Sequence, residues 1–236
     1  MGKLGIYLVA DYPSRDAFLE AVRACQDMSV DFLEVGIPFS DPVADGDVLE
    51  RASHAVLRER NVHDFVDALH EARAIFLGSL YVMTYTNIVY SLGQAAFVKR
   101  LGPLSGLILA DLPLREIGAF EKGLKGSGAN LIRFLTPESR EADVASALAG
   151  AKGFIYFVSK RGTTGGAFDL DAETKKKIAA VRGKGVDVFI GFGIQEKRDL
   201  EAAYEAADGA IIGTRAVAEL EQGVNRFRAY LKSLSM

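Results

Sequence analysis

The sequence feature that most constrains the fold is a regular alternation of short apolar runs with longer segments of helical character. The runs are rich in Ile, Val, Leu, Tyr and Phe, and Gly, Pro, Asp or Asn bounds each of them. This pattern is typical of strands that are buried on both faces of a parallel sheet. We assign eight strands to residues 6–10, 32–36, 80–84, 107–110, 131–135, 154–158, 188–191 and 210–212.

Segments with helical character separate these runs. We predict helices over residues 16–28, 48–73 (one or two helices, with a break near Asn61), 94–101, 115–124, 141–149, 172–182, 197–206 and 216–234. Eight strand–helix repeats predict an α/β fold, a (β/α)8 TIM barrel that forms a single domain over residues 1–236. A doubly wound open sheet is the alternative, but so many short, evenly spaced strands fit it less well.

The composition excludes several classes of protein. Of the 236 residues, 49% are hydrophobic and 25% charged, and the formal net charge of −3 does not suggest binding to nucleic acid or to an anionic membrane. No apolar run is long enough to span a bilayer as a helix. The one cysteine, Cys25, excludes an intramolecular disulfide, and without an apparent signal peptide it predicts a cytoplasmic protein.

The stretch "LEVGIPFSDPVADGDVLE" places two acids where a barrel has its active site, at the C-terminal end of a strand and in the loop that follows. If Leu33 and Val35 face the helices, Glu34 faces the barrel mouth. Desolvation there would raise its pKa and suit it to proton transfer, although an ion pair with a basic residue is the alternative. Asp45 follows in a loop stiffened by two prolines, where it could also be only a turn residue.

Three glycine-bearing loops follow the last three predicted strands: "SKRGTTGG" (159–166), "GFGIQ" (191–195) and "IIGTRAV" (211–217). Glycine lets a phosphate approach backbone N–H groups, and a helix N-terminus adds partial positive charge. Any one of these glycines could mark a plain turn, but together they predict a barrel of the phosphate-binding type. We expect a small phosphate ester, with its phosphate near the loops after the seventh and eighth strands, where the Thr214 hydroxyl could add a direct bond, and with its reactive end toward Glu34.

Other kinds of site find little support in the sequence. The three histidines, His54, His63 and His70, lie in one helical segment and are read as outer helix residues, so no zinc or other metal site is predicted. The glycine-rich loops match neither the Walker pattern nor a dinucleotide fingerprint.

Several motifs resemble the tryptophan synthase alpha-subunit family. "EVGIPFSDPVADGD" is similar to the family signature, a strand with a catalytic Glu followed by G-[IV]-P-F-S-D-P-x-A-D-G-P, and departs from it only at its last position. Further similar segments are "YVMTYTN", "ILADLPLRE", "YFVSKRGTTG", "GFGI" and "GAIIGTRAV". They occur in the family's order over essentially the whole chain.

The resemblance implies a lyase of tryptophan biosynthesis that cleaves indole-3-glycerol phosphate by a retro-aldol reaction into indole and glyceraldehyde 3-phosphate. Glu34 would transfer the protons, Asp45 would stabilise positive charge on the indole ring, and Tyr156 would sit beside Glu34. The implied phosphate-binding residues are Gly165, Phe192, Gly193, Gly213 and Thr214. The implied substrate pocket consists of Tyr7, Leu49, Met83, Tyr85, Ile108 and Thr164.

The resemblance also implies no metal or organic cofactor in this chain. It implies a beta-subunit partner that carries pyridoxal phosphate and receives indole through a tunnel in an alpha2beta2 heterotetramer. The chain departs from the family at Asp47 (Pro expected), Asp11 (Gly), Lys160 (Arg) and Thr163 (Val), and only four residues precede Gly5, where an extension is usual. We expect these departures to affect loop closure, coupling to the partner and stability. Two alternatives stay open: a weakly active or inactive allosteric partner of the beta subunit, and another sugar-phosphate barrel enzyme.

Overall fold

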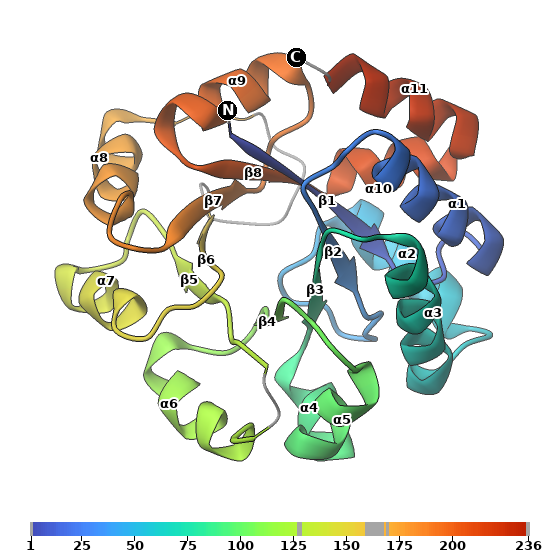
Figure 1. Ribbon diagram of the computed structural model, residues 1–236, viewed down its shortest axis with the longest axis horizontal. Helices are drawn as coiled ribbons and strands as arrows, with labels where there is room; N and C mark the ends of the chain where they lie inside the picture. Colours follow the sequence, from blue (N-terminus) through green and yellow to red (C-terminus); the bar gives the residue numbers. More distant parts are fainter. Residues whose placement is uncertain (1, 127–128, 159–167, 169, 235–236) are drawn as a thin grey trace.

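The computed structural model describes residues 2–126, 129–158, 168 and 170–234. Its parallel strands are β1 (Lys3–Val9), β2 (Phe32–Gly36), β3 (Ser79–Thr84), β4 (Gly106–Leu109), β5 (Arg133–Leu135), β6 (Phe154–Val158), β7 (Asp187–Gly191) and β8 (Gly209–Ile212). They pair in the order β4-β3-β2-β1-β8-β7-β6-β5. A bridge between Leu107 and Leu131 then brings the two ends of the sheet together, so the barrel is nearly closed (Figure 1).

Helices surround this sheet as an outer ring (Figure 1). They are α1 (Arg15–Asp27), α2 (Asp47–Leu57), α3 (Val62–Ile75), α4 (Thr86–Leu92), α5 (Gln94–Leu101), α6 (Leu114–Gly123), α7 (Glu141–Leu148), α8 (Ala172–Val181), α9 (Lys197–Ala206), α10 (Thr214–Glu221) and α11 (Val224–Leu234). Within the described part of the chain, none of these helices has the length and apolar character that a membrane crossing requires.

The predicted barrel is confirmed, and so is the break near Asn61, but two of the helix predictions need correction. The break near Asn61 is real, because the Asn61 side chain accepts a hydrogen bond from the His63 N–H and caps α3. The single helix predicted over residues 216–234 is wrong, since α10 and α11 are separated at Gly223, whose φ of 110° a helix cannot continue through. Helix α4 was not predicted at all.

Aromatic rings fill the N-terminal half of the barrel. Phe32 stacks on Phe189 with ring centroids 4.9 Å apart, Phe189 stacks on Phe154 at 4.5 Å, and Tyr81 meets Phe154 edge-on at 5.0 Å. Such side-chain layers make a barrel interior a packed core rather than a pore. The C-terminal half of the barrel is therefore where a site can open.

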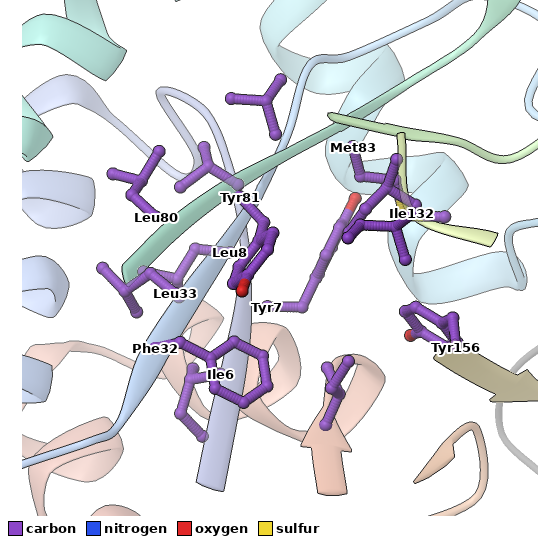
Figure 2. Packing of buried hydrophobic residues seen from close by; sticks show 14 of the residues in the cluster. Ile6, Tyr7, Leu8, Phe32, Leu33, Leu80, Tyr81, Met83, Ile132 and Tyr156 are labelled. Atoms are coloured by element: carbon purple, nitrogen blue, oxygen red, sulfur yellow. The ribbon is translucent and has the colours of Figure 1, made fainter. Parts of the chain in front are cut away.

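Two glycines at strand ends make room for that site. A Cβ on Gly36, the last residue of β2, would lie 2.0 Å from the Tyr7 Oη, and one on Gly191, the last residue of β7, would lie 2.4 Å from Tyr156. Each glycine thus lets a tyrosine ring cross the barrel over a strand end. Figure 2 shows these two tyrosines extending from β1 and β6 into the interior.

A candidate active site at the C-terminal end of the barrel

The C-terminal ends of the strands and the loops that follow them form a pocket. Its lining residues are Tyr7, Glu34, Asp45, Leu49, Met83, Tyr156, Phe192, Gly193, Ile194, Gln195, Ile211, Gly213 and Thr214. Residues that are far apart in the sequence thus meet at the end of the barrel where barrel enzymes carry their active sites.

Glu34 is the most unusual residue of the pocket. Its side chain is fully buried, and neither carboxyl oxygen has a hydrogen-bond partner among the described residues. Burial, and to a lesser degree the charge of Asp45, raises the pKa of Glu34 from its ordinary value to about 8. Glu34 therefore holds a proton at neutral pH and can act as a general acid. The alternative of a structural ion pair is not seen in the described part of the chain.

Asp45 reaches the same pocket from the loop after β2 and differs from Glu34 in its surroundings. Burial raises the pKa of Asp45 to about 6, although a hydrogen bond from Tyr85 opposes this rise and the charge of Glu50 adds to it. Asp45 is thus mostly ionised at neutral pH, where Glu34 is mostly protonated. One pocket holds a proton donor and a carboxylate under the same conditions.

Contacts with Tyr85, which directly follows β3, and with α2 hold the loop that carries Asp45. The Ala44 N–H donates to the Tyr85 Oη at 3.3 Å, and the Phe39 ring stacks on Tyr85 with centroids 4.9 Å apart. On the other side, the His54 Nε2 lies 3.0 Å from the carbonyl oxygen of Ser40. The loop is therefore held at Phe39 and Ser40 and again at Ala44, the residue directly before Asp45.

Tyr7 and Tyr156 add two hydroxyl groups to the pocket. Burial raises the pKa of Tyr7 well above its ordinary value, and the charges of Asp45 and Glu34 add to this rise. The pKa of Tyr156 is raised in the same way by burial and then by Glu34 and Asp45. Both phenols therefore stay neutral at any working pH and remain able to donate hydrogen bonds.

The other part of the pocket is made of backbone. Phe192 and Gly193 have φ values of 78° and 84°, so two consecutive residues after β7 are left-handed. A left-handed Phe is costly, and such strain is concentrated at functional sites. Gly213 and Thr214 begin α10 beside this loop, and the N–H groups at a helix start favour an anion.

Most of the predicted site residues meet in the pocket, and some do not line it. Tyr85 contacts the Asp45 loop rather than the pocket, and Ile108 is buried in β4 without lining it. Gly165 and Thr164, as well as the departures Lys160 and Thr163, lie outside the described residues. The pocket also contains Ile194, Gln195 and Ile211, which belong to the predicted glycine loops but are not among the predicted site residues.

Two departures from the family pattern find a physical explanation. Asp47 is the exposed first residue of α2, a position that favours both proline and an acid, because proline lacks the N–H that would be unpaired there and an acid complements the helix dipole. Asp11 has a φ of 64°, which explains why glycine is expected there. Its buried carboxylate ion-pairs with Arg15, whose Nη1 also lies 2.7 Å from the Glu71 Oε1.

Comparison with known proteins agrees with this geometry. The sequence profile of the family described as tryptophan synthase alpha chain matches residues 2–236. The tryptophan synthase alpha chain of Lactiplantibacillus plantarum is 36% identical over 218 residues, which cover 89% of this chain and 81% of that protein. That of Methanosarcina mazei is 34% identical over 228 residues, which cover 95% of this chain and 83% of that protein.

A solved structure shares the fold over nearly the whole chain. It is that of Mycobacterium tuberculosis tryptophan synthase, with a TM-score of 0.89 and 31% identity, and the match covers 99% of this chain and 91% of that chain. The motif resemblance, the barrel and the relatives all agree. The chain belongs to the tryptophan synthase alpha chain family.

Proposed function

We propose that this chain is a lyase that cleaves indole-3-glycerol phosphate into indole and glyceraldehyde 3-phosphate, a step of aromatic amino-acid biosynthesis. The observation that carries the proposal is the pair formed by a buried, protonated Glu34 and an ionised Asp45 in one pocket. A retro-aldol cleavage of this substrate needs both states at once. Indole C3, whose bond to the glycerol side chain breaks, must receive a proton. The ring nitrogen must have a negative charge close to it.

The steps follow from these two groups. Protonated Glu34 delivers its proton to indole C3, and positive charge develops on the ring. Asp45 accepts a hydrogen bond from the ring N–H and stabilises that charge. The bond between C3 and the glycerol carbon then breaks and its electron pair restores the indole. The adjacent hydroxyl becomes the aldehyde carbonyl, and the carboxylate of Glu34 recovers a proton from it.

The remaining walls of the pocket fit the two halves of the substrate. Tyr7, Leu49 and Met83 supply a buried, largely apolar surface for the indole ring, and the Tyr156 side chain lines the same pocket as Glu34. We assign the phosphate to the N–H groups of residues 192–193 and 213–214, with Gly165 as a further expected contact. The left-handed backbone at Phe192 and Gly193 supports this assignment.

The proposal includes a tryptophan synthase beta chain as partner, with pyridoxal phosphate in that chain and none in this one. Membership of the tryptophan synthase alpha chain family supports this partner. A cytoplasmic location belongs to the same proposal, since the sequence has only one cysteine, Cys25, and it is buried.

An indole-release assay tests the function. The purified chain is incubated with indole-3-glycerol phosphate, alone and with a purified tryptophan synthase beta chain, and both products are measured. Other sugar phosphates are assayed in parallel for isomerisation or epimerisation. We expect indole and glyceraldehyde 3-phosphate in equal amounts. Turnover of another sugar phosphate, without cleavage of indole-3-glycerol phosphate, would favour a different sugar-phosphate barrel enzyme. No cleavage, but faster turnover of the beta chain, would favour an inactive allosteric partner.

A further inference from the structure

A tyrosine outside the pocket holds one of the pocket loops. Tyr230 lies on α11 and is 8% exposed, and its hydroxyl donates a hydrogen bond of 2.8 Å to the carbonyl oxygen of Gln195. Gln195 lines the pocket together with Phe192, Gly193 and Ile194. Helix α11, which contributes no residue to the pocket lining in the described part of the chain, therefore contacts the loop after β7 directly.

The loop is fixed from a second helix at the same residue. The Gln195 N–H donates to the Asp199 Oδ2 at 2.9 Å, and the N–H of Glu196 donates to the same oxygen at 3.1 Å. Asp199 lies in the first turn of α9, only a few residues further along the chain. Of these three hydrogen bonds, the one from Tyr230 joins segments that are 35 residues apart in the sequence.

Tyr230 also contacts the helix that begins at the other backbone segment of the pocket. The Arg215 guanidinium lies over the Tyr230 ring, 5.9 Å from its centroid, and Arg215 follows Thr214 directly. An ion-pair network fixes the guanidinium, because the Glu219 carboxylate, almost fully buried, lies 2.5 Å from Arg215 Nη2 and 2.7 Å from Arg226 Nε. Tyr230 thus lies between the loop after β7 and the start of α10.

We propose that Tyr230 is a positioning residue that fixes residues 192–195 relative to the N-terminus of α10. In this way it sets the spacing of the two backbone segments that take the substrate phosphate. The inference rests on the proposed function for the identity of the substrate, but the positioning itself concerns only the phosphate half of the pocket. Figure 1 shows α10 and α11 as neighbours on the outside of the barrel, beside β1 and β8.

The test removes only the hydroxyl. Tyr230→Phe keeps the ring under Arg215 and loses the hydrogen bond to Gln195, so the loop loses a long-range contact. Tyr204→Phe is the matched control, because Tyr204 lies on the neighbouring helix α9 and lines a different surface depression near Lys3 and Asp208. The dissociation constant for inorganic phosphate is measured by calorimetry, KM and kcat for indole-3-glycerol phosphate by indole release, and folding by thermal unfolding.

We expect Tyr230→Phe to raise the phosphate dissociation constant and KM about fivefold, with kcat within about twofold of wild type, as the loss of one net hydrogen bond predicts. Tyr204→Phe should leave all three unchanged. Equal phosphate affinity in Tyr230→Phe and wild type, or a fall in kcat alone, would overturn the proposal, and so would a wild type that binds no phosphate. A wild type without lyase activity, whose phosphate binding still weakens in Tyr230→Phe, would refute the lyase function and support the positioning role.

Discussion

The negative charge of Asp45 adds to burial in raising the pKa of Glu34, and both carboxyl groups line one pocket. The two pKa values, about 8 for Glu34 and about 6 for Asp45, therefore differ in the direction that assigns each acid a separate task. Between these values Glu34 holds its proton while Asp45 has lost its own. This window includes neutral pH.

The separation predicts a bell-shaped pH dependence of kcat/KM for indole release. Activity should fall below a pH of about 6, where Asp45 gains a proton, and above about 8, where Glu34 loses its proton. Initial rates between pH 5 and 9 at low substrate concentration measure both limbs. A rate that stays constant up to pH 9 would show that a protonated Glu34 is not required.

Tyr85→Phe should move the acid limb of this profile upward. The hydrogen bond from Tyr85 lowers the pKa of Asp45, so its removal leaves burial and the charge of Glu50 with less opposition. We expect the acid limb to shift to higher pH by about one to two units, the size of an ordinary charge-assisted hydrogen bond. Tyr90→Phe on α4 is the control, because Tyr90 is exposed and should leave the profile in place.

Glu34 should also make the stability of the protein depend on pH. Because the folded-state pKa is raised from 4.5 to about 8, the native state binds an extra proton between these values. The stabilisation is fully present below about 4.5 and is lost as the pH rises through 8. Glu34→Gln removes this loss, so relative to wild type it should gain a few kcal/mol, in order of magnitude, between pH 5 and pH 9. Urea unfolding of both proteins at pH 5 and pH 9 measures the difference between their free energies of unfolding. If this difference were the same at both pH values, the prediction would be contradicted.

Gly36→Ala should damage the pocket more than the fold. The new Cβ would lie 2.0 Å from the Tyr7 Oη, so the tyrosine ring must move, at a cost of about 1–3 kcal/mol. We expect a lower thermal midpoint and a higher KM for the indole-bearing substrate. Gly118→Ala on α6 meets no atom within 4 Å and should instead stabilise the protein by about 0.5–1 kcal/mol. If Gly36→Ala and Gly118→Ala changed the thermal midpoint and KM in the same way, the position of the Tyr7 ring would not depend on Gly36.

Much of the barrel can be predicted from the sequence, because strands buried on both faces leave uninterrupted apolar runs. Helix α4 could not be predicted in this way, because the residue that caps its N-terminus lies far along the chain. The Asp111 carboxylate, in the loop after β4, accepts from the Thr86 N–H at 2.8 Å and from the Thr86 hydroxyl at 2.7 Å. The N-terminus of α4 thus receives its cap from a residue that no local pattern connects to it.

The same distinction holds for the site. Glu34 stands out because a charge within an apolar run is unusual, and the glycines after β7 and β8 stand out by their type. Gln195 and Ile211 carry no such signal, since an amide in a loop and an Ile in a strand have many ordinary roles. The bond from Tyr230 to Gln195 depends on the packing of α11 and so is visible only in the fold.

The roles assigned to the two acids are tested most directly by comparing indole release from indole-3-glycerol phosphate by wild type and Glu34→Gln. Glutamine keeps the shape of Glu34 but cannot deliver the proton. The account predicts that kcat falls by about 10²–10⁴-fold in Glu34→Gln, the usual contribution of a general acid, while the affinity for inorganic phosphate stays that of wild type. A Glu34→Gln variant that releases indole at the wild-type rate would contradict it.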